Sequence, residues 1–85
     1  MKKFVYEIQD VLGIHARPAG MLVKEATNYE CNVILKCGEK EKSVKTIMGI
    51  MTMNIKTGDE VTVICKGSDE IVASKELEQF FRTNL

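Results

Sequence analysis

The spacing between apolar residues changes several times along the chain, and this limits the folds that the chain can adopt. Residues 3–8 (KFVYEI) place an apolar side chain at every second position, which predicts a strand with one buried face. Residues 17–28 (RPAGMLVKEATN) place them three and four positions apart, which predicts a helix that ends near Thr27–Asn28. Its buried face is expected to contain Ala19, Leu22, Val23 and Ala26.

Three more segments have the character of strands. Residues 31–37 (CNVILKC) and 60–66 (EVTVICK) alternate again, and each predicts a strand with an apolar inner face. Gly38-Glu39 reads as a hairpin turn into a polar strand near 40–45, whose lysines suit an exposed sheet edge.

Two further helices are predicted. Residues 47–53 (IMGIMTM) form a short apolar segment with Ile47, Ile50 and Met51 at helical spacing. The last helix follows a turn at residues 67–69, where Ser68 or Asp69 can cap its start. Its apolar face is expected to contain Ala73, Leu77, Phe80 and Phe81.

The predicted order of elements is therefore β-α-β-β-α-β-α. This order implies an α+β fold, a two-layer open-faced β-sandwich in which three helices cover one face of a four-stranded antiparallel sheet. The chain has 85 residues and is 45% apolar. We expect a single domain over residues 1–85, because chains of about 60 residues already bury about 60% of their unfolded surface.

The charge and cysteine content exclude several function classes. Twelve basic and twelve acidic residues give no net charge, which argues against a nucleic-acid or membrane binder. Cys31, Cys37 and Cys65 are an odd number without CxxC spacing, which favours a reducing compartment. They are expected to act as small hydrophobic residues, with Cys37 the most accessible. We expect a cytoplasmic protein, because no signal peptide or apolar run near the ~20 residues of a membrane span is present.

The only histidine, His15, lies just ahead of the predicted first helix. The N–H groups at a helix start have no partners within the helix and carry partial positive charge, which attracts anions such as phosphate. Arg17 adds a forked donor for phosphate oxygens. Pro18 fits the first turn, where its missing N–H costs nothing.

This arrangement indicates an imidazole that takes a phosphoryl group. A neutral ring is nucleophilic near neutral pH, and the positive charges around His15 are expected to keep the ring neutral. The prearranged donors would then stabilise the charge of the phosphoryl group. A surface histidine at a helix cap is the alternative. A metal site is disfavoured, because Arg17 would repel a cation.

Two stretches resemble a known family. Residues 13–19 (GIHARPA) are similar to the active-site signature of HPr, the histidine-containing phosphocarrier family of the phosphoenolpyruvate–sugar phosphotransferase system. Residues 45–51 (KTIMGIM) resemble that family's regulatory-site signature, KSIMGxM. The separation of the two stretches, the chain length and the order of elements also match, so the resemblance covers essentially the whole chain.

The resemblance implies a covalent shuttle more than an enzyme, with no metal or organic cofactor. His15 would accept a phosphoryl group on Nδ1 from phosphorylated enzyme I and pass it to a histidine of a sugar-specific enzyme IIA. Arg17 would neutralise the phosphate oxygens, Pro18 would fix the helix start, and Ala16 would offer an amide of the helix N-terminus. We expect a monomer with transient partners.

A partner-binding surface is expected beside His15. Gly20, Met21 and Lys24 lie off the buried face of the first helix, and exposed Met and Ile beside a reactive residue are typical of an adaptable contact surface. The resemblance implies that enzyme I, the IIA proteins and regulators bind there. The expected members are Gly20, Met21, Lys24, Ile47, Met48, Gly49 and Met51. Core packing is the preferred explanation of Met51 and Met53, and an open alternative for Met48.

Thr46 precedes the short helix and is a natural N-cap. A phosphate there would add about −1.5 to −2 charges beside Lys45 and would hinder a phosphorylated partner. In the low-GC Gram-positive branch of the HPr family, which this chain resembles, HPr kinase/phosphorylase phosphorylates a serine at this position. The phosphorylated protein is a corepressor for the catabolite control protein. Thr46 departs from that serine, and its methyl restricts χ1. Leu12 departs as well, since many relatives have a small polar residue there.

Plain capping is therefore an alternative to regulation at Thr46. Two other functional hypotheses also stay open at this point. One is a regulatory binding module that acts mainly through phosphorylated Thr46, and the other is a two-layer domain without chemistry.

Overall fold

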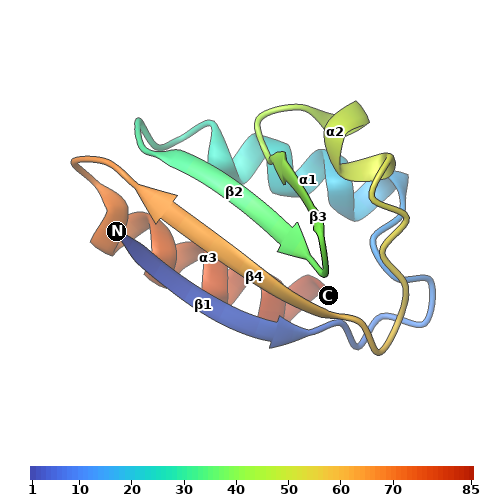
Figure 1. Ribbon diagram of the computed structural model, residues 1–85. Helices are drawn as coiled ribbons and strands as arrows, with labels where there is room; N and C mark the ends of the chain where they lie inside the picture. Colours follow the sequence, from blue (N-terminus) through green and yellow to red (C-terminus); the bar gives the residue numbers. More distant parts are fainter.

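The computed structural model describes residues 1–85 as one four-stranded antiparallel sheet with helices packed on one face (Figure 1). The strands are β1 (Lys2–Glu7), β2 (Asn32–Cys37), β3 (Lys40–Ser43) and β4 (Glu60–Lys66). The helices are α1 (Ala16–Ala26), α2 (Ile47–Met51) and α3 (Glu70–Asn84). The predicted element order and fold class are confirmed, and the predicted boundaries agree closely except at the ends of β3 and α2.

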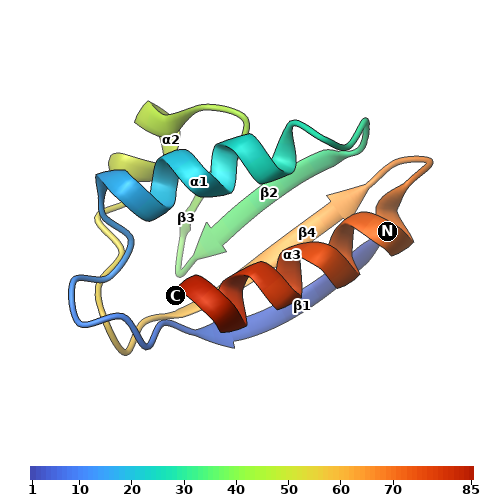
Figure 2. The ribbon, with the colours of Figure 1, turned by 180° about the vertical axis from the view of Figure 1, so that it is seen from behind.

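The strand order in the sheet is β1-β4-β2-β3. The central strand β4 pairs with β1 through Tyr6 and Val61, and with β2 through Leu35 and Val63. Figure 2 shows α1 and α3 side by side across the back of the sheet, with α2 beside α1. Every residue of the edge strand β3 is exposed, as its lysine-rich sequence predicted.

The core lies between the sheet and the two long helices. The expected inner faces of α1 and α3 are confirmed, with Val23 and Phe80 half-buried at their margins. Phe81 packs its ring edge-to-face against Phe4 and Tyr6, with ring centroids 5.7 Å apart in both pairs. Such aromatic pairs contribute about 0.5–1.5 kcal/mol beyond the area they bury.

The short helix α2 buries only Ile50. It packs on α1 and at the end of β3, away from the sheet face, so its other apolar side chains reach the surface. Met51 is 38% exposed, whereas Met53, just after the helix, is buried in the core. Core packing is thus confirmed for Met53, and it is wrong for Met51.

The start of α3 differs from the sequence expectation. Asp69 occupies the N-cap position, but its side chain forms no capping bond. Its carboxylate instead accepts hydrogen bonds from the amides of Glu30, at 2.8 Å, and Cys31, at 2.9 Å. These bonds, the one from Glu30 foremost, lower the pKa of Asp69. The carboxylate of Asp69 therefore ties the loop before β2 to the start of α3.

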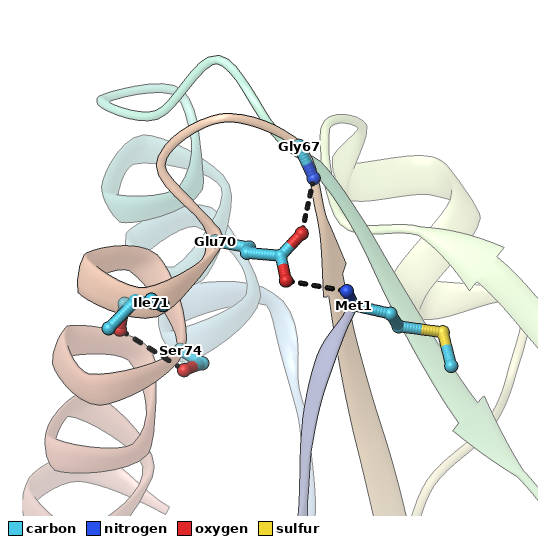
Figure 3. Close-up of polar contacts among 5 residues, drawn as sticks. All are labelled: Met1, Gly67, Glu70, Ile71 and Ser74. Carbon is cyan, nitrogen blue, oxygen red and sulfur yellow. Dashed lines mark hydrogen bonds and ion pairs between the residues drawn. The ribbon is translucent and has the colours of Figure 1, made fainter.

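The next carboxylate, Glu70, joins α3 to the sheet. As Figure 3 shows, it accepts from the amide of Gly67, at 3.0 Å, and pairs with the terminal ammonium of Met1. In the same view, the hydroxyl of Ser74 donates to the carbonyl of Ile71 at 3.2 Å. The pairing with the ammonium is the main reason that the pKa of Glu70 is lowered.

All three cysteines are free thiols. Cys31 and Cys65 are buried and Cys37 is half-buried, which confirms the expected inward faces and the greater accessibility of Cys37. Burial raises the pKa of each thiol, to about 12 for Cys65. None of the three helices combines the length and the apolar character that a membrane crossing requires.

Candidate functional site

The loop between β1 and α1 holds His15 at the surface. Gly13 adopts a positive φ of 67°, and its amide donates to the carbonyl of Asp10 at 2.9 Å, which closes a tight turn. Ile14 is buried, and its amide donates to the carbonyl of Ile55 at 3.1 Å. These contacts fix the backbone immediately before His15.

His15 itself is the N-cap residue of α1. Its backbone is extended, with φ −100° and ψ −177°, and its side chain forms no capping bond. Its carbonyl accepts from the amide of Ala19 at 3.0 Å. The amides of Ala16 and Arg17 donate to no acceptor, and Pro18 has no N–H. The two residues after His15 thus have free backbone N–H groups at the positive end of the helix. This arrangement is suited to binding an anion.

A shallow pocket surrounds the imidazole, whose side chain is 35% exposed. The guanidinium of Arg17 forms no ion pair, so its donors are free for an anion. The pocket is lined by Asp10, His15, Arg17, Pro18, Met21 and Asn84. The structure thus brings together His15, Arg17 and Pro18, as the sequence predicted.

Two residues of this pocket were missed from the sequence. Asp10 reaches it through the turn at Gly13, and its Oδ2 lies 3.9 Å from His15 Nε2. The structure therefore adds a carboxylate to the positive charges that the sequence placed around the ring. The spacing from Asp10 to Gly13 in a loop was a usable signal for this turn. Asn84 comes from the end of α3, and no local pattern could have placed it here.

Thr46 caps α2, as predicted. Its exposed side chain accepts from the amide of Gly49 at 3.2 Å. The ammonium of Lys45, however, donates to the carbonyls of Ala26, at 2.9 Å, and Tyr29, at 2.7 Å, at the end of α1. Two of the three N–H groups of the Lys45 ammonium are therefore already used at the end of α1.

The expected partner-binding residues lie on adjacent parts of α1 and α2. Met48 is 74% exposed, which settles the open alternative for this residue against core packing. Ile47 is exposed as well, and it packs beside Gly20 of α1. The side chain of Met21 lines the His15 pocket. We call the exposed side chains of these two helices the α1–α2 surface: Met21, Lys24, Ile47, Met48 and Met51.

Exposed apolar side chains extend beyond the residues that the sequence predicted for this surface. Val11 and Leu12 are both strongly exposed in the loop that leads to His15. Exposed apolar residues therefore lie on both sides of His15 along the chain. Such a distribution is typical of a protein-binding surface.

Known proteins resemble this chain over most of its length. Residues 2–83 match the family profile described as the PTS HPr component phosphorylation site. The phosphocarrier protein HPr of Mycoplasma capricolum subsp. capricolum is 42% identical over 79 residues, which cover 93% of this chain and 89% of the relative.

Solved structures show the same similarity. A Mycoplasma histidine-containing phosphocarrier protein matches with a TM-score of 0.91 at 40% identity, over 93% of this chain and 90% of the other. HPr-C-His from Thermoanaerobacter tengcongensis matches with a TM-score of 0.92 at 32% identity, over 98% and 93%. The resemblance carried by residues 13–19 and 45–51 is confirmed: this chain belongs to the HPr family of phosphocarrier proteins of the phosphotransferase system.

Proposed function

We propose that this protein carries phosphoryl groups in the cytoplasm, accepting them on Nδ1 of His15 from enzyme I and passing them to sugar-specific enzyme IIA domains. One observation carries the proposal. A half-exposed imidazole stands at the start of α1, ahead of two free amides and an unpaired guanidinium. Residues 1–85 would act as one HPr-like domain, since a single core joins the sheet to the helices.

The neighbours of His15 suit the charge of a phosphoryl group. The free amides of Ala16 and Arg17 and the Arg17 guanidinium supply donors for its oxygens, and Pro18 leaves no further N–H to desolvate. Donors fixed before the reaction stabilise developing charge without reorganisation. Transfer breaks a P–N bond on the donor histidine and forms one on His15, so no cofactor is needed.

The shallow setting of His15 suits a carrier better than a stand-alone enzyme. A ring that is 35% exposed can meet a donor protein and later an acceptor protein, which a deep pocket would prevent. The α1–α2 surface, together with Gly20 and Gly49 beneath it, would dock both partners. Its methionines can adapt to differently shaped surfaces.

A second candidate function is regulation at Thr46. Its hydroxyl is exposed and stands at the start of the helix that carries Met48. A phosphate there would add about −1.5 to −2 charges to the α1–α2 surface and repel a phosphorylated partner. An HPr kinase/phosphorylase would add the phosphate, and the catabolite control protein would bind the product. In the alternative hypothesis, this regulatory role is the main one.

One experiment tests the carrier function. The purified protein is incubated with phosphoenolpyruvate and enzyme I, and phosphate incorporation is followed by phosphorus NMR. We expect an acid-labile phosphate that His15→Ala abolishes and Arg17→Ala strongly reduces, while both variants keep the circular dichroism of the parent. If the parent takes up no acid-labile phosphate, the carrier function is refuted.

A parallel incubation with ATP and an HPr kinase tests the regulatory role. An acid-stable phosphate that is lost in Thr46→Val and kept in His15→Ala would support it. If only this label forms, the regulatory alternative replaces the carrier.

A further inference from the structure

The carboxylate of Asp10 faces the ring nitrogen that would not be phosphorylated. Its Oδ2 lies 3.9 Å from Nε2 of His15, and the side chain of Asp10 is only 27% exposed. Asp10 and Arg17 are the charged residues that line the pocket around the ring. A carboxylate on the Nε2 side leaves Nδ1 on the other edge of the ring.

The position of this carboxylate is fixed by its own turn. Oδ1 accepts from the amide of Leu12 at 2.9 Å, and the Asp10 carbonyl accepts from the amide of Gly13 at 2.9 Å. The amide of Asp10 donates to the carbonyl of Leu85 at 2.8 Å. One carboxylate oxygen is therefore used within the turn, and the other is directed at His15.

We propose that Asp10 is a positioning residue for His15. Its carboxylate oxygen Oδ2 attracts the proton on Nε2 and so favours the tautomer in which the Nδ1 lone pair is free. The inference rests on the proposed function, in which Nδ1 is the phosphoryl acceptor. The tautomer of an imidazole is set by the group that its other nitrogen meets. A 3.9 Å separation is longer than a hydrogen bond, and such contacts shorten in reacting complexes.

The same carboxylate matches the charge change during transfer. The Nδ1 lone pair forms the new P–N bond while the P–N bond of the donor phosphohistidine breaks, and the donor nitrogen keeps that electron pair. Nε2 retains its proton throughout, so the phosphorylated ring becomes cationic. The negative Asp10 side chain faces that new positive charge and stabilises it.

Asp10→Asn gives a sharp test, because the amide oxygen can still accept from Leu12. The side-chain amide nitrogen of the asparagine then takes the place of Oδ2 and faces His15 Nε2, so that a hydrogen-bond donor replaces an acceptor at this position. Nitrogen NMR of the isotope-labelled ring at about pH 9, where a free imidazole is neutral, reports the tautomer. We expect the Nε2–H form to predominate in the parent and the Nδ1–H form to gain in Asp10→Asn.

Asp59→Asn is the matched control. Asp59 also accepts from a nearby backbone amide, that of Lys56 at 2.9 Å, and it does not line the pocket. Its replacement removes the same charge and is expected to leave the tautomer unchanged. An unchanged tautomer in Asp10→Asn, or an equal change in both variants, would overturn the inference.

A second measurement links the contact to reactivity. Phosphoramidate, a small phosphoryl donor, replaces the partner protein, and phosphorus NMR follows the label on His15. We expect Asp10→Asn to be roughly tenfold slower at about pH 9, the lower end of the loss seen when a metal-ligating histidine loses the partner of its other ring nitrogen. Asp59→Asn should match the parent. Equal rates in Asp10→Asn and the parent would overturn the positioning role.

The two measurements separate the inference from the proposed function. If the parent takes no phosphate from either phosphoramidate or enzyme I, the carrier function is refuted. A tautomer change confined to Asp10→Asn would still uphold the Asp10–His15 contact.

Discussion

Gly13 packs directly against the carbonyl of Ile55. A Cβ on Gly13 would lie 2.7 Å from the Cα of Lys56 and closer still to the Ile55 oxygen, which also accepts from the amide of Ile14 at 3.1 Å. The loop that carries His15 is therefore docked on the segment that follows α2. This contact holds the first sequence motif against the backbone just beyond the second one.

Gly13→Ala should strongly destabilise the protein and displace His15. The new methyl meets backbone atoms that cannot move aside, and the φ of 67° already disfavours alanine. We expect the free energy of unfolding to fall by about 3 kcal/mol, measured by urea denaturation. Gly38→Ala is the control, because Gly38 has a φ of 62° but nothing within 4 Å of its Cβ position. It should lose only about 1 kcal/mol, and equal losses would contradict the steric explanation.

Thr46→Val and Gly49→Ala should weaken the same cap. Valine removes the oxygen that accepts from Gly49, and a Cβ on Gly49 would lie 2.7 Å from that oxygen. We expect each substitution to lower the free energy of unfolding by about 1 kcal/mol. The double variant should lose clearly less than the sum of the two, because both changes remove one contact. A fully additive double variant would show that the two residues act separately.

Lys45→Met should destabilise the end of α1. The substitution keeps the apolar stem but removes the ammonium that donates to Ala26 and Tyr29, and hydrogen bonds to charged groups contribute about 1.5–3 kcal/mol each. Because Lys45 is only half-buried, we expect a total loss of about 2 kcal/mol in thermal or chemical unfolding. Lys24→Met, on the exposed face of α1, should change stability by less than about 0.5 kcal/mol. Similar losses in both would contradict a specific role for Lys45.

The stabilising effect of Asp69 should disappear in acid. Its pKa is lowered from the ordinary 3.8 by the amides of Glu30 and Cys31, so the folded state favours the ionised form. This contribution is fully present above pH 3.8 and is lost as the pH falls through the lower folded value. Asp69→Asn should therefore be less stable than the parent near neutral pH, and the two should converge in strong acid. A stability difference that persists there would contradict this explanation, and Glu39→Gln, at the exposed hairpin turn, serves as the control.

The cysteines should differ sharply in reactivity. Thiol reagents attack the thiolate, and burial holds the thiols of Cys31 and Cys65 in the protonated form, with a pKa of about 12 for Cys65. We expect one thiol per chain to react first under native conditions, and Cys37→Ser to remove this early phase. The other two should react only on unfolding. Early reaction in Cys37→Ser would show that the inner sheet face opens in the native state.

The spacing of apolar residues in the sequence determined which segments form strands and which form helices. The residues at the start of α1 determined where the candidate site lies. Whether a segment buries one face as a strand or as a helix follows from neighbouring residues, so the β-α-β-β-α-β-α order could be predicted. His15, Arg17 and Pro18 lie within one helical turn, and their roles at a helix start follow from local backbone geometry. For the same reason the cap at Thr46 was predictable.

Only the tertiary structure decided which distant groups meet. The side chain of Lys45 reaches the end of α1, and that of Asp69 reaches the loop before β2. Met51 at the end of α2 is exposed and Met53 just after it is buried, because the position of α2 on α1 sets which of these side chains faces the core. Asp10 meets His15 only after the turn at Gly13 closes. Such contacts depend on how separate elements pack, and the periodicity of one segment carries no information about that packing.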